Sequence, residues 1–434
     1  MKKVNLLAAA IVAASLIAPA ANAANVNFGG YLRSGVMHGN GGQMTKFNVN
    51  KVGRLGNEND TYGEVALSSD IATVDDTVWT VNSRLTIASN SRNRDWQQTG
   101  GKDMENNEIA LREFNVMAKG LLDWDKDAVV WVGKRFYKRE DIHITDMYFY
   151  DISGYGAGLE NLGLGTGKLD IAWIRQDDQA DYRDHAPDSE TSKHFVSLNK
   201  FDVRYNFPVW DGASLQVADT YYVPERDNKS LVLKNEINNA NTFDVELNQG
   251  YSLGWNKTVL QWMHGSNANG VHYGTGNWLD YNGNSNSANG FRVINFGDTA
   301  FTDVFKMQHV INCAWSGGYD DNVDKKSTYS VVVRPFFQLT KMTRIITELG
   351  AYWDTTKYKV GDKNKEKGQK FTVAYGLTPD ASNVWSRPEI RFFVSYVHGT
   401  NKTGDVKNNP SLTLQTGNDA NHDVMFGAQV EAWW

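Results

Sequence analysis

Four short segments of the sequence place an aromatic residue in phase with ionisable residues. Side chains of an extended strand alternate between two faces, so residues two apart share a face. The pairs that share a face in this way are Tyr31 with Arg33, Tyr62 with Glu64, Trp385 with Arg387, and Trp433 with Glu431. A pyranose has flat apolar faces and a rim of hydroxyl groups, so aromatic rings beside charged hydrogen-bonding side chains suit a bound sugar. The four segments therefore predict a carbohydrate-binding surface that faces water.

The elements that must carry these residues read as β-strands from end to end of the chain. Runs rich in aromatic and β-branched side chains recur at 168–176, 214–223, 257–265, 329–339, 344–353 and 390–399. Tight turns lie at 210–213, 252–257 and 339–343, whereas long Gly/Asn/Asp-rich stretches occupy roughly 91–110, 177–196, 265–300 and 398–421. Short turns that alternate with long loops are typical of an outer-membrane barrel, with the turns on the periplasmic side and the loops outside the cell.

The average hydropathy does not contradict a membrane location. Mean hydropathy is −0.49, and beyond the N-terminal segment no run of about 18 apolar residues could form a membrane-spanning helix. A transmembrane barrel also looks polar by this average, because lipid-facing and lumen-facing residues alternate. At roughly 9–11 residues per crossing the chain accommodates about 16–18 strands, and a barrel that wide has an aqueous interior. We therefore expect an all-β, transmembrane antiparallel β-barrel.

The first residues predict secretion. Lys2 and Lys3 precede an apolar run that ends in Ala21-Asn22-Ala23, which is the pattern of a signal peptide over residues 1–23. Residues 24–434 then form a single domain, since no proline-rich or serine-rich linker divides them. The location expected for such a barrel is the outer membrane of a Gram-negative bacterium. With one cysteine, Cys313, no intramolecular disulfide can form, and a net charge of −6 argues against nucleic acid as a partner.

Tryptophans at strand ends predict an aromatic girdle at the membrane interface, where an amphipathic ring is at home. The residues assigned to it are Trp131, Trp210, Trp255, Trp353 and Trp434. Trp434 lies on the apolar row of the closing segment 426–434, whereas Trp433 shares a face with Gln429 and Glu431. The two neighbouring tryptophans should therefore face lipid and lumen, respectively.

Three other kinds of site are alternatives to sugar passage. Asp141, His143 and Asp146 could form a metal site or a catalytic acid pair, but they match no recognised ligand pattern, and sequence spacing cannot show a pair of carboxylates flanking a sugar. The Gly-rich run 163–170 precedes a strand rather than a helix, so a turn is favoured over a phosphate loop. We therefore expect no catalytic residue, no metal and no cofactor. A soluble lectin or glycan enzyme, and a general diffusion pore without a sugar site, remain open.

Beyond these patterns, the segment 134–161, KRFYKREDIHITDMYFYDISGYGAGLEN, resembles the signature segment of the maltoporin family of sugar-specific outer-membrane porins. Further motifs resemble the family in the same order: GYLRSG at 30–35, RLGNENDTY at 54–62, LREFNV at 111–116, WSRP at 385–388 and FGAQVEAWW at 426–434. The resemblance implies an 18-stranded homotrimer in outer-membrane lipid and a passive channel for maltose and maltodextrins. Other oligosaccharides or β-glucosides are the alternative substrates.

The resemblance also implies which residues contact the sugar. The aromatic line would comprise Tyr31, Tyr62, Trp96, Trp278, Trp385 and Trp433, with Trp96 on a loop that reaches into the neighbouring subunit's channel. The polar track and constriction would comprise Arg33, Arg54, Glu64, Arg112, Arg139, Asp141, His143, Asp146 and Tyr148, partly on an inward-folded loop within 134–161. Arg112 shares a phase with Phe114 and Val116, so a lumen position requires either a bulge or a strand that starts after Arg112, and it is implied by the resemblance alone.

The external loops are where the resemblance is weakest. The first loop has no cysteine, whereas family members can carry a disulfide there, so its rigidity is open. The stretches 177–196, 265–300 and 398–421 diverge from the family pattern. External loops govern phage attachment in the family. A role as phage receptor is therefore compatible with the resemblance but is not implied by it, because these loops diverge.

Overall fold

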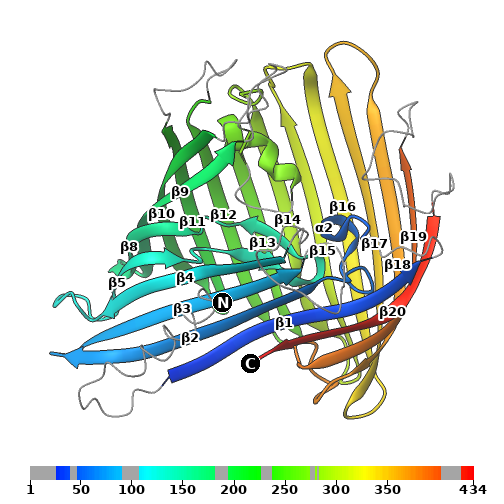
Figure 1. Ribbon diagram of the computed structural model, residues 1–434, viewed down its shortest axis with the longest axis horizontal. Coiled ribbons are helices and arrows are strands. Elements are labelled where there is room, and N and C mark those ends of the chain that lie inside the picture. The colour runs from blue at the N-terminus through cyan, green and yellow to red at the C-terminus, as the bar shows by residue number, and fades with distance from the viewer. Residues whose placement is uncertain are drawn as a thin grey trace, which may run out of the picture.

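The computed structural model describes residues 26–39, 46–89, 107–180, 194–225, 237–273, 279–280, 283–401 and 422–434. Within them, eighteen antiparallel strands form one closed barrel (Figure 1). Each wall strand pairs with the next along the chain, and β1 pairs with β20 to close the cylinder. The barrel strands are β1 (Val26–Gly39), β2 (Thr61–Val74), β3 (Thr77–Ser89), β4 (Asn107–Lys119), β5 (Val129–Arg135), β8 (Gly154–Leu164), β9 (Gly167–Ala180), β10 (His194–Trp210), β11 (Ala213–Glu225), β12 (Ala240–Tyr251), β13 (Gly254–His264), β14 (Asn289–Ala300), β15 (Phe305–Gly317), β16 (Val323–Gln338), β17 (Thr343–Tyr358), β18 (Asn364–Leu377), β19 (Glu389–Asn401) and β20 (His422–Trp433).

The remaining elements lie between barrel strands. They are a short helix α2 (Val49–Val52), a two-stranded hairpin of β6 (Glu140–Ile142) and β7 (Met147–Tyr150), and the 3-10 helices η1 (His143–Thr145) and η2 (Gly265–His272). In Figure 1, α2 and its flanking segment lie against the inner side of the wall. No helix among the described residues is long and apolar enough to cross a membrane.

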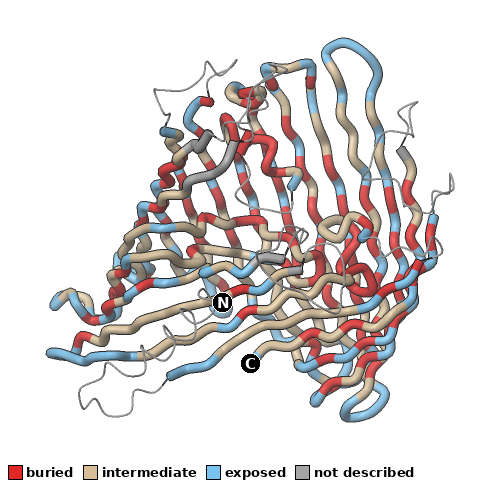
Figure 2. Tube along the Cα trace, viewed as in Figure 1, coloured by how far each residue is buried: buried red, intermediate tan, exposed pale blue. Residues whose placement is uncertain are grey.

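Burial alternates along the wall strands, as expected for a barrel with two different solvents (Figure 2). On β18, Phe371, Val373 and Tyr375 are exposed on the outer face, whereas Lys370 and Thr372 are buried on the inner face. Apolar side chains on the outside and polar side chains on the inside are the reverse of a soluble core. The all-β transmembrane barrel predicted from the sequence is confirmed.

The connections differ between the two ends of the barrel. At one end the strands are joined by short turns such as 75–76, 165–166 and 252–253. Long connections lie at the other end, but two short ones, 318–322 and 359–363, occur there as well. The predicted loop 265–300 was too long, because residues 289–300 form β14. Its alternation of outward Phe291 and Val293 with inward Arg292 was obscured by the preceding Gly/Asn-rich run.

Two members of the predicted aromatic girdle are wrong. Trp210, Trp353 and Trp434 are exposed on the outside, as expected. Trp131 is 1% exposed and packs on Tyr137 inside the barrel, with ring centroids 5.3 Å apart. Trp255 is also inside the barrel, where it packs on Phe296. The reason is that segments folded into the lumen require apolar partners on the inner wall, which strand position alone does not reveal.

Candidate functional site

The lumen is narrowed by two segments, the first inner segment (residues 46–60) and the second inner segment (residues 136–153). Asn57 organises the first. Its fully buried amide accepts a hydrogen bond from Phe47 N (2.8 Å) and donates to Phe47 O (2.7 Å) and Gly53 O (3.0 Å). Gly53 has φ 93°, and a Cβ there would lie 2.3 Å from a carboxylate oxygen of Glu348. Glycine at 53 thus allows close contact with the wall.

Wall side chains then bind the backbone of the first inner segment. Leu55 N donates to Glu348 Oε1 (3.0 Å), and Lys370 Nζ donates to Leu55 O (2.8 Å). Gly56 N donates to Gln429 Oε1 at 3.1 Å. These buried polar groups satisfy the segment's backbone, which could not otherwise leave water. The described part of the first loop is therefore held in place without a disulfide.

The second inner segment is attached to the wall in the same manner. Arg292 Nη2 and Gln261 Nε2 both donate to Phe149 O, at 2.8 and 3.0 Å. Arg334 Nη2 donates to Ile144 O at 3.2 Å. The apolar side chains of this segment, including Phe149 and Ile144, pack in one buried cluster with wall residues such as Val259. The predicted inward-folded loop is therefore present.

The two inner segments touch each other across the lumen. Arg54 N donates to Ile144 O at 3.0 Å, and Asn50 Nδ2 donates to Asp146 O at 2.7 Å. Residues about 90 positions apart in the sequence are thereby placed side by side: Arg54 contacts Ile144, and Asn50 contacts Asp146. This contact forms the polar side of the constriction.

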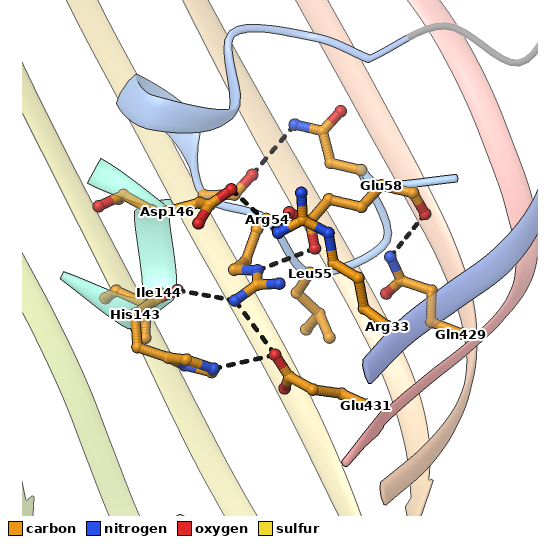
Figure 3. A network of polar contacts seen from close by, with 12 residues as sticks. Arg33, Arg54, Leu55, Glu58, His143, Ile144, Asp146, Gln429 and Glu431 are labelled. Atoms are coloured by element: carbon orange, nitrogen blue, oxygen red, sulfur yellow. Dashed lines mark hydrogen bonds and ion pairs between the residues drawn. The ribbon is translucent and has the colours of Figure 1, made fainter. Parts of the chain in front are cut away.

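Glu431 on β20 lies at the centre of a charged cluster (Figure 3). Its carboxylate oxygens lie 2.8–3.1 Å from side-chain atoms of Tyr31, Arg54, His143, Arg387 and Arg391. Glu431 is 2% exposed, so this carboxylate depends on those partners to remain charged. Three predicted site residues thus meet at one carboxylate: Tyr31, Arg54 and His143. The sequence identifies Glu431 itself only as a residue that shares a face with Trp433.

Arg33 forms the second half of the charged cluster. Its guanidinium lies 2.9 Å from Asp60, 3.1 Å from Asp146 and 3.5 Å from Glu58. Burial acts to raise the pKa of Asp146, but Arg54 and Arg33 outweigh it and hold this pKa below its ordinary value. The aspartate on the inner segment is therefore ionised and fixed in position.

Aromatic rings form a row beside this cluster. The rings of Tyr62 and Tyr31 have centroids 6.0 Å apart, and Tyr31 is directly opposite Trp433 in the β1–β20 pair. The imidazole of His143 lies edge-on to Trp433 at 5.6 Å and to Trp385 at 5.5 Å. Four rings chosen by strand parity therefore lie together in the lumen.

Trp255, which was not among the predicted members of the aromatic line, extends the row. The indole N–H groups of Trp255 and Trp385 both donate to Asp298 Oδ2, at 2.7 and 2.8 Å. With Trp433 they line a cavity of about 380 Å³, whose polar lining includes Asp141 and His309. A usable signal was present in the sequence, because Trp255 shares strand parity with Lys257 and Gln261.

The remaining predicted polar residues lie around Phe136. The guanidinium of Arg139 stacks on the rings of Tyr148 (4.0 Å) and Phe136 (4.4 Å), and that of Arg112 stacks on Phe136 at 5.0 Å. Arg112 is the extra residue of a β-bulge, since Arg84 pairs with Glu113 and Leu85 pairs with Leu111. The bulge turns Arg112 toward the inner segment, as its predicted position required.

Four predicted residues need separate mention. Glu64 bonds to the Tyr62 hydroxyl and to Arg84, so it orients a ring of the row. Asp141 lines the 380 Å³ cavity, and burial raises its pKa. Trp96 and Trp278 lie outside the described residues.

Comparison with known proteins identifies the family of the chain. The family model of the LamB porins matches residues 26–434. Maltoporin 1 of Klebsiella pneumoniae subsp. pneumoniae is 36% identical over 432 residues, covering 99% of this chain and 97% of the relative. Maltoporin 2 of Yersinia pestis (strain Pestoides F) is 35% identical with the same coverage. The crystal structure of OccK2 (OpdF) from Pseudomonas aeruginosa shares a TM-score of 0.49 and 10% identity, over 94% of this chain and 97% of that one.

The family match spans the barrel from β1 to the last residue, so it includes every strand described above. A porin is a channel, which favours passage over catalysis for the residues gathered in the lumen. The chain belongs to the LamB porin family, and its barrel lies in the outer membrane of a Gram-negative bacterium.

Proposed function

We propose that this protein is a passive channel for maltose and maltodextrins, with the aromatic row as its sugar-binding surface. The observation that carries the proposal is the continuous row from Tyr62 through Tyr31, Trp433 and Trp385 to Trp255, flanked by the charged cluster on Glu431. No cofactor or energy source is required for movement down a concentration gradient.

The row and the cluster fit the two kinds of surface on a sugar. Aromatic rings can stack on the apolar faces of successive pyranoses, and we take each contact to be of the order of the roughly 0.5–1.5 kcal/mol that a pair of aromatic rings contributes beyond the buried area. Charged side chains such as Arg33 and Asp146 can exchange hydrogen bonds with sugar hydroxyls, and charge-assisted bonds are the stronger kind. Because similar contacts repeat along the row, a sugar can leave one position as it enters the next, which conduction requires.

The choice of maltodextrins rests on the similar proteins named maltoporin. A barrel of this family could retain its row and accept other oligosaccharides or β-glucosides, so the linkage must be measured. A general diffusion pore is the second candidate. It is disfavoured because a pore without a sugar site has no use for rings beside charges in its lumen.

Current through single channels in a planar bilayer tests the proposal. Maltohexaose added at increasing concentration should interrupt the ion current in discrete blocks whose frequency rises with concentration. An unblocked current at every concentration would leave only a general pore. Repeating the titration with cellodextrins, sucrose and β-glucosides would identify the preferred linkage.

We also propose that the channel is a homotrimer in which the loop bearing Trp96 reaches the lumen of a neighbour. Trp96→Ala should then weaken sugar block without changing the mass of the detergent-solubilised particle. A particle with the mass of one chain would contradict the trimer. Recovery as a soluble secreted protein would instead favour a lectin.

Residues 1–23 are proposed to be a signal peptide that is removed on export. Mass spectrometry of the protein from outer membranes should then find a mature chain that begins at Ala24. A chain in which Lys2 and Lys3 are retained would contradict this assignment.

A further inference from the structure

The lumen contains a second cavity, the side pocket, of about 340 Å³. This volume falls within the roughly 300–1,000 Å³ of small-molecule sites. Three wall strands, α2, η2 and the second inner segment surround it, and its lining is largely amide, hydroxyl and charged side chains. The lining residues used below are Asn312, Lys326, Asp354 and His272.

The side pocket lies on the outer side of the constriction and is separate from the aromatic row. Lys326 is near the start of β16 at Val323, and Asp354 is near the end of β17 at Tyr358, whereas the short turn 339–342 joins these strands at their opposite ends. The pocket shares no lining residue with the 380 Å³ cavity of Trp255 and Trp385. A sugar that enters from outside would therefore meet the side pocket first.

Three polar groups of the pocket are left incompletely satisfied within the part of the chain that the structure describes. Asn312 is 5% exposed, and its buried side-chain Oδ1 has no hydrogen-bond partner there. Lys326 Nζ donates one hydrogen bond, to Asn269 Oδ1 at 3.1 Å, and pairs with no carboxylate among those residues. Asp354 binds Lys51 through one oxygen, while its buried Oδ1 has no partner. Buried polar groups normally have partners, so these atoms are available to bind a ligand that offers both donors and acceptors.

The chemistry of these groups distinguishes between kinds of ligand. An anion would suit the ammonium of Lys326, but an anion without a donor group could not satisfy the acceptor oxygens Asn312 Oδ1 and Asp354 Oδ1. A hydroxyl group both donates and accepts, so a polyol can satisfy Lys326, Asn312 and Asp354 together. Burial lowers the pKa of His272 to about 3, and its ring nitrogens bond to Thr328 and Ser316, so it adds no charge.

We infer that the side pocket binds one hexose unit of an incoming sugar by hydrogen bonds alone, and so loads the aromatic row from the outer side. This inference rests on the proposed sugar channel and adds to it a capture site made of amides, hydroxyls and Lys326. Because the pocket is lined by β15–β17 and η2 rather than by the strands of the row, capture and passage can be separated by mutation.

Sided addition of maltohexaose to single oriented channels tests the inference. Lys326→Met and Asn312→Leu should each lower the association rate from the outer side by roughly two- to tenfold, the factor that one hydrogen bond contributes. The rate from the periplasmic side and the duration of each block should change by less than about twofold, because the row is intact. Lys326→Arg keeps the charge and the donor, and should restore the outer rate.

The matched control is Lys325→Met, which removes the same charge from the exposed neighbour on β16. Equal slowing by Lys325→Met, or equal slowing from both sides of the membrane, would overturn the side pocket as a sugar site. An unchanged association rate from the outer side in both Lys326→Met and Asn312→Leu would also overturn the side pocket as a sugar site. This result would leave the proposed channel function intact. A wild-type channel that maltohexaose does not block would reject the proposed function, and the inference with it.

Discussion

Tyr31 and Trp433 are directly opposite each other across the strand pair that closes the barrel. Tyr31 belongs to the first strand and Trp433 to the last, and the Tyr31 hydroxyl donates to Glu431, two residues before Trp433, at 2.9 Å. The aromatic row therefore crosses the closing seam. It exists only when the barrel is closed, so sugar binding and correct closure should be linked.

The neighbouring tryptophans at the C-terminus should have separable roles. Trp433 lies in the lumen against His143 and Arg387, so Trp433→Ala should lower maltohexaose affinity roughly three- to tenfold with little loss of folded barrel. Trp434 is 50% exposed outside and packs on Phe28 at 5.7 Å. Trp434→Ala should reduce the yield of folded barrel and leave affinity unchanged. Both variants can be compared by current block and by heat-modifiable migration on gels, and equal effects on both measurements would contradict two different faces.

Trp255 should contribute to sugar affinity, although its position at a strand end suggested the girdle. Its ring lines the cavity that Trp385 and Trp433 also line. Trp255→Ala should shorten the maltohexaose blocks by roughly three- to tenfold, because one stacking surface is lost. Trp210→Ala is the matched control, since Trp210 is also near the short-turn end but is 55% exposed outside. Blocks of equal length in the two variants would place Trp255 outside the sugar path.

Asn57 should control the width of the open channel. Asn57→Leu removes three hydrogen bonds to Phe47 and Gly53, and each buried group left unpaired costs about 1–3 kcal/mol. The first inner segment should then leave its place for part of the time, which would raise both the mean current and its noise. Asn82→Ala removes a lumen asparagine whose partners among the described residues are the wall residues Asn115 and Met117, and should leave the noise unchanged. Identical noise in both variants would show that Asn57 does not hold the segment.

His143 should make the barrel less stable in acid. Burial lowers its pKa from 6.5 to about 4, against the opposing effect of Glu431. Between these pH values the unfolded chain binds a proton that the folded protein does not, so the stability due to neutral His143 is complete above pH 6.5 and is lost as the pH falls toward 4. The loss is on the order of 3 kcal/mol. His143→Gln cannot titrate, so its melting temperature should fall less than that of the wild type between pH 6.5 and 4, and parallel curves would contradict the pKa.

The sequence by itself was sufficient for the architecture and for much of the site. Strand alternation separates a lipid face from a lumen face, because a lipid-exposed strand requires apolar side chains at every second position. This rule alone assigned Tyr31, Tyr62, Trp385 and Trp433 to one face. The resemblance of the sequence motifs to the maltoporin family added Arg54 and His143, which do not lie on barrel strands and so have no strand parity.

The tertiary structure decided which lumen residues meet. Parity gives each residue a side of the wall but no partner across the lumen, so it could not show that Glu431 gathers Arg54, His143 and Tyr31 from three segments. Strand parity also assumes that every side chain on the inner face of the wall contacts water. The inner segments break that assumption, because their apolar side chains and backbone groups need cover from the wall, and this is why Trp131 and Trp255 turn inward. Contacts between segments far apart in sequence exist only after the barrel closes and the inner segments fold into it.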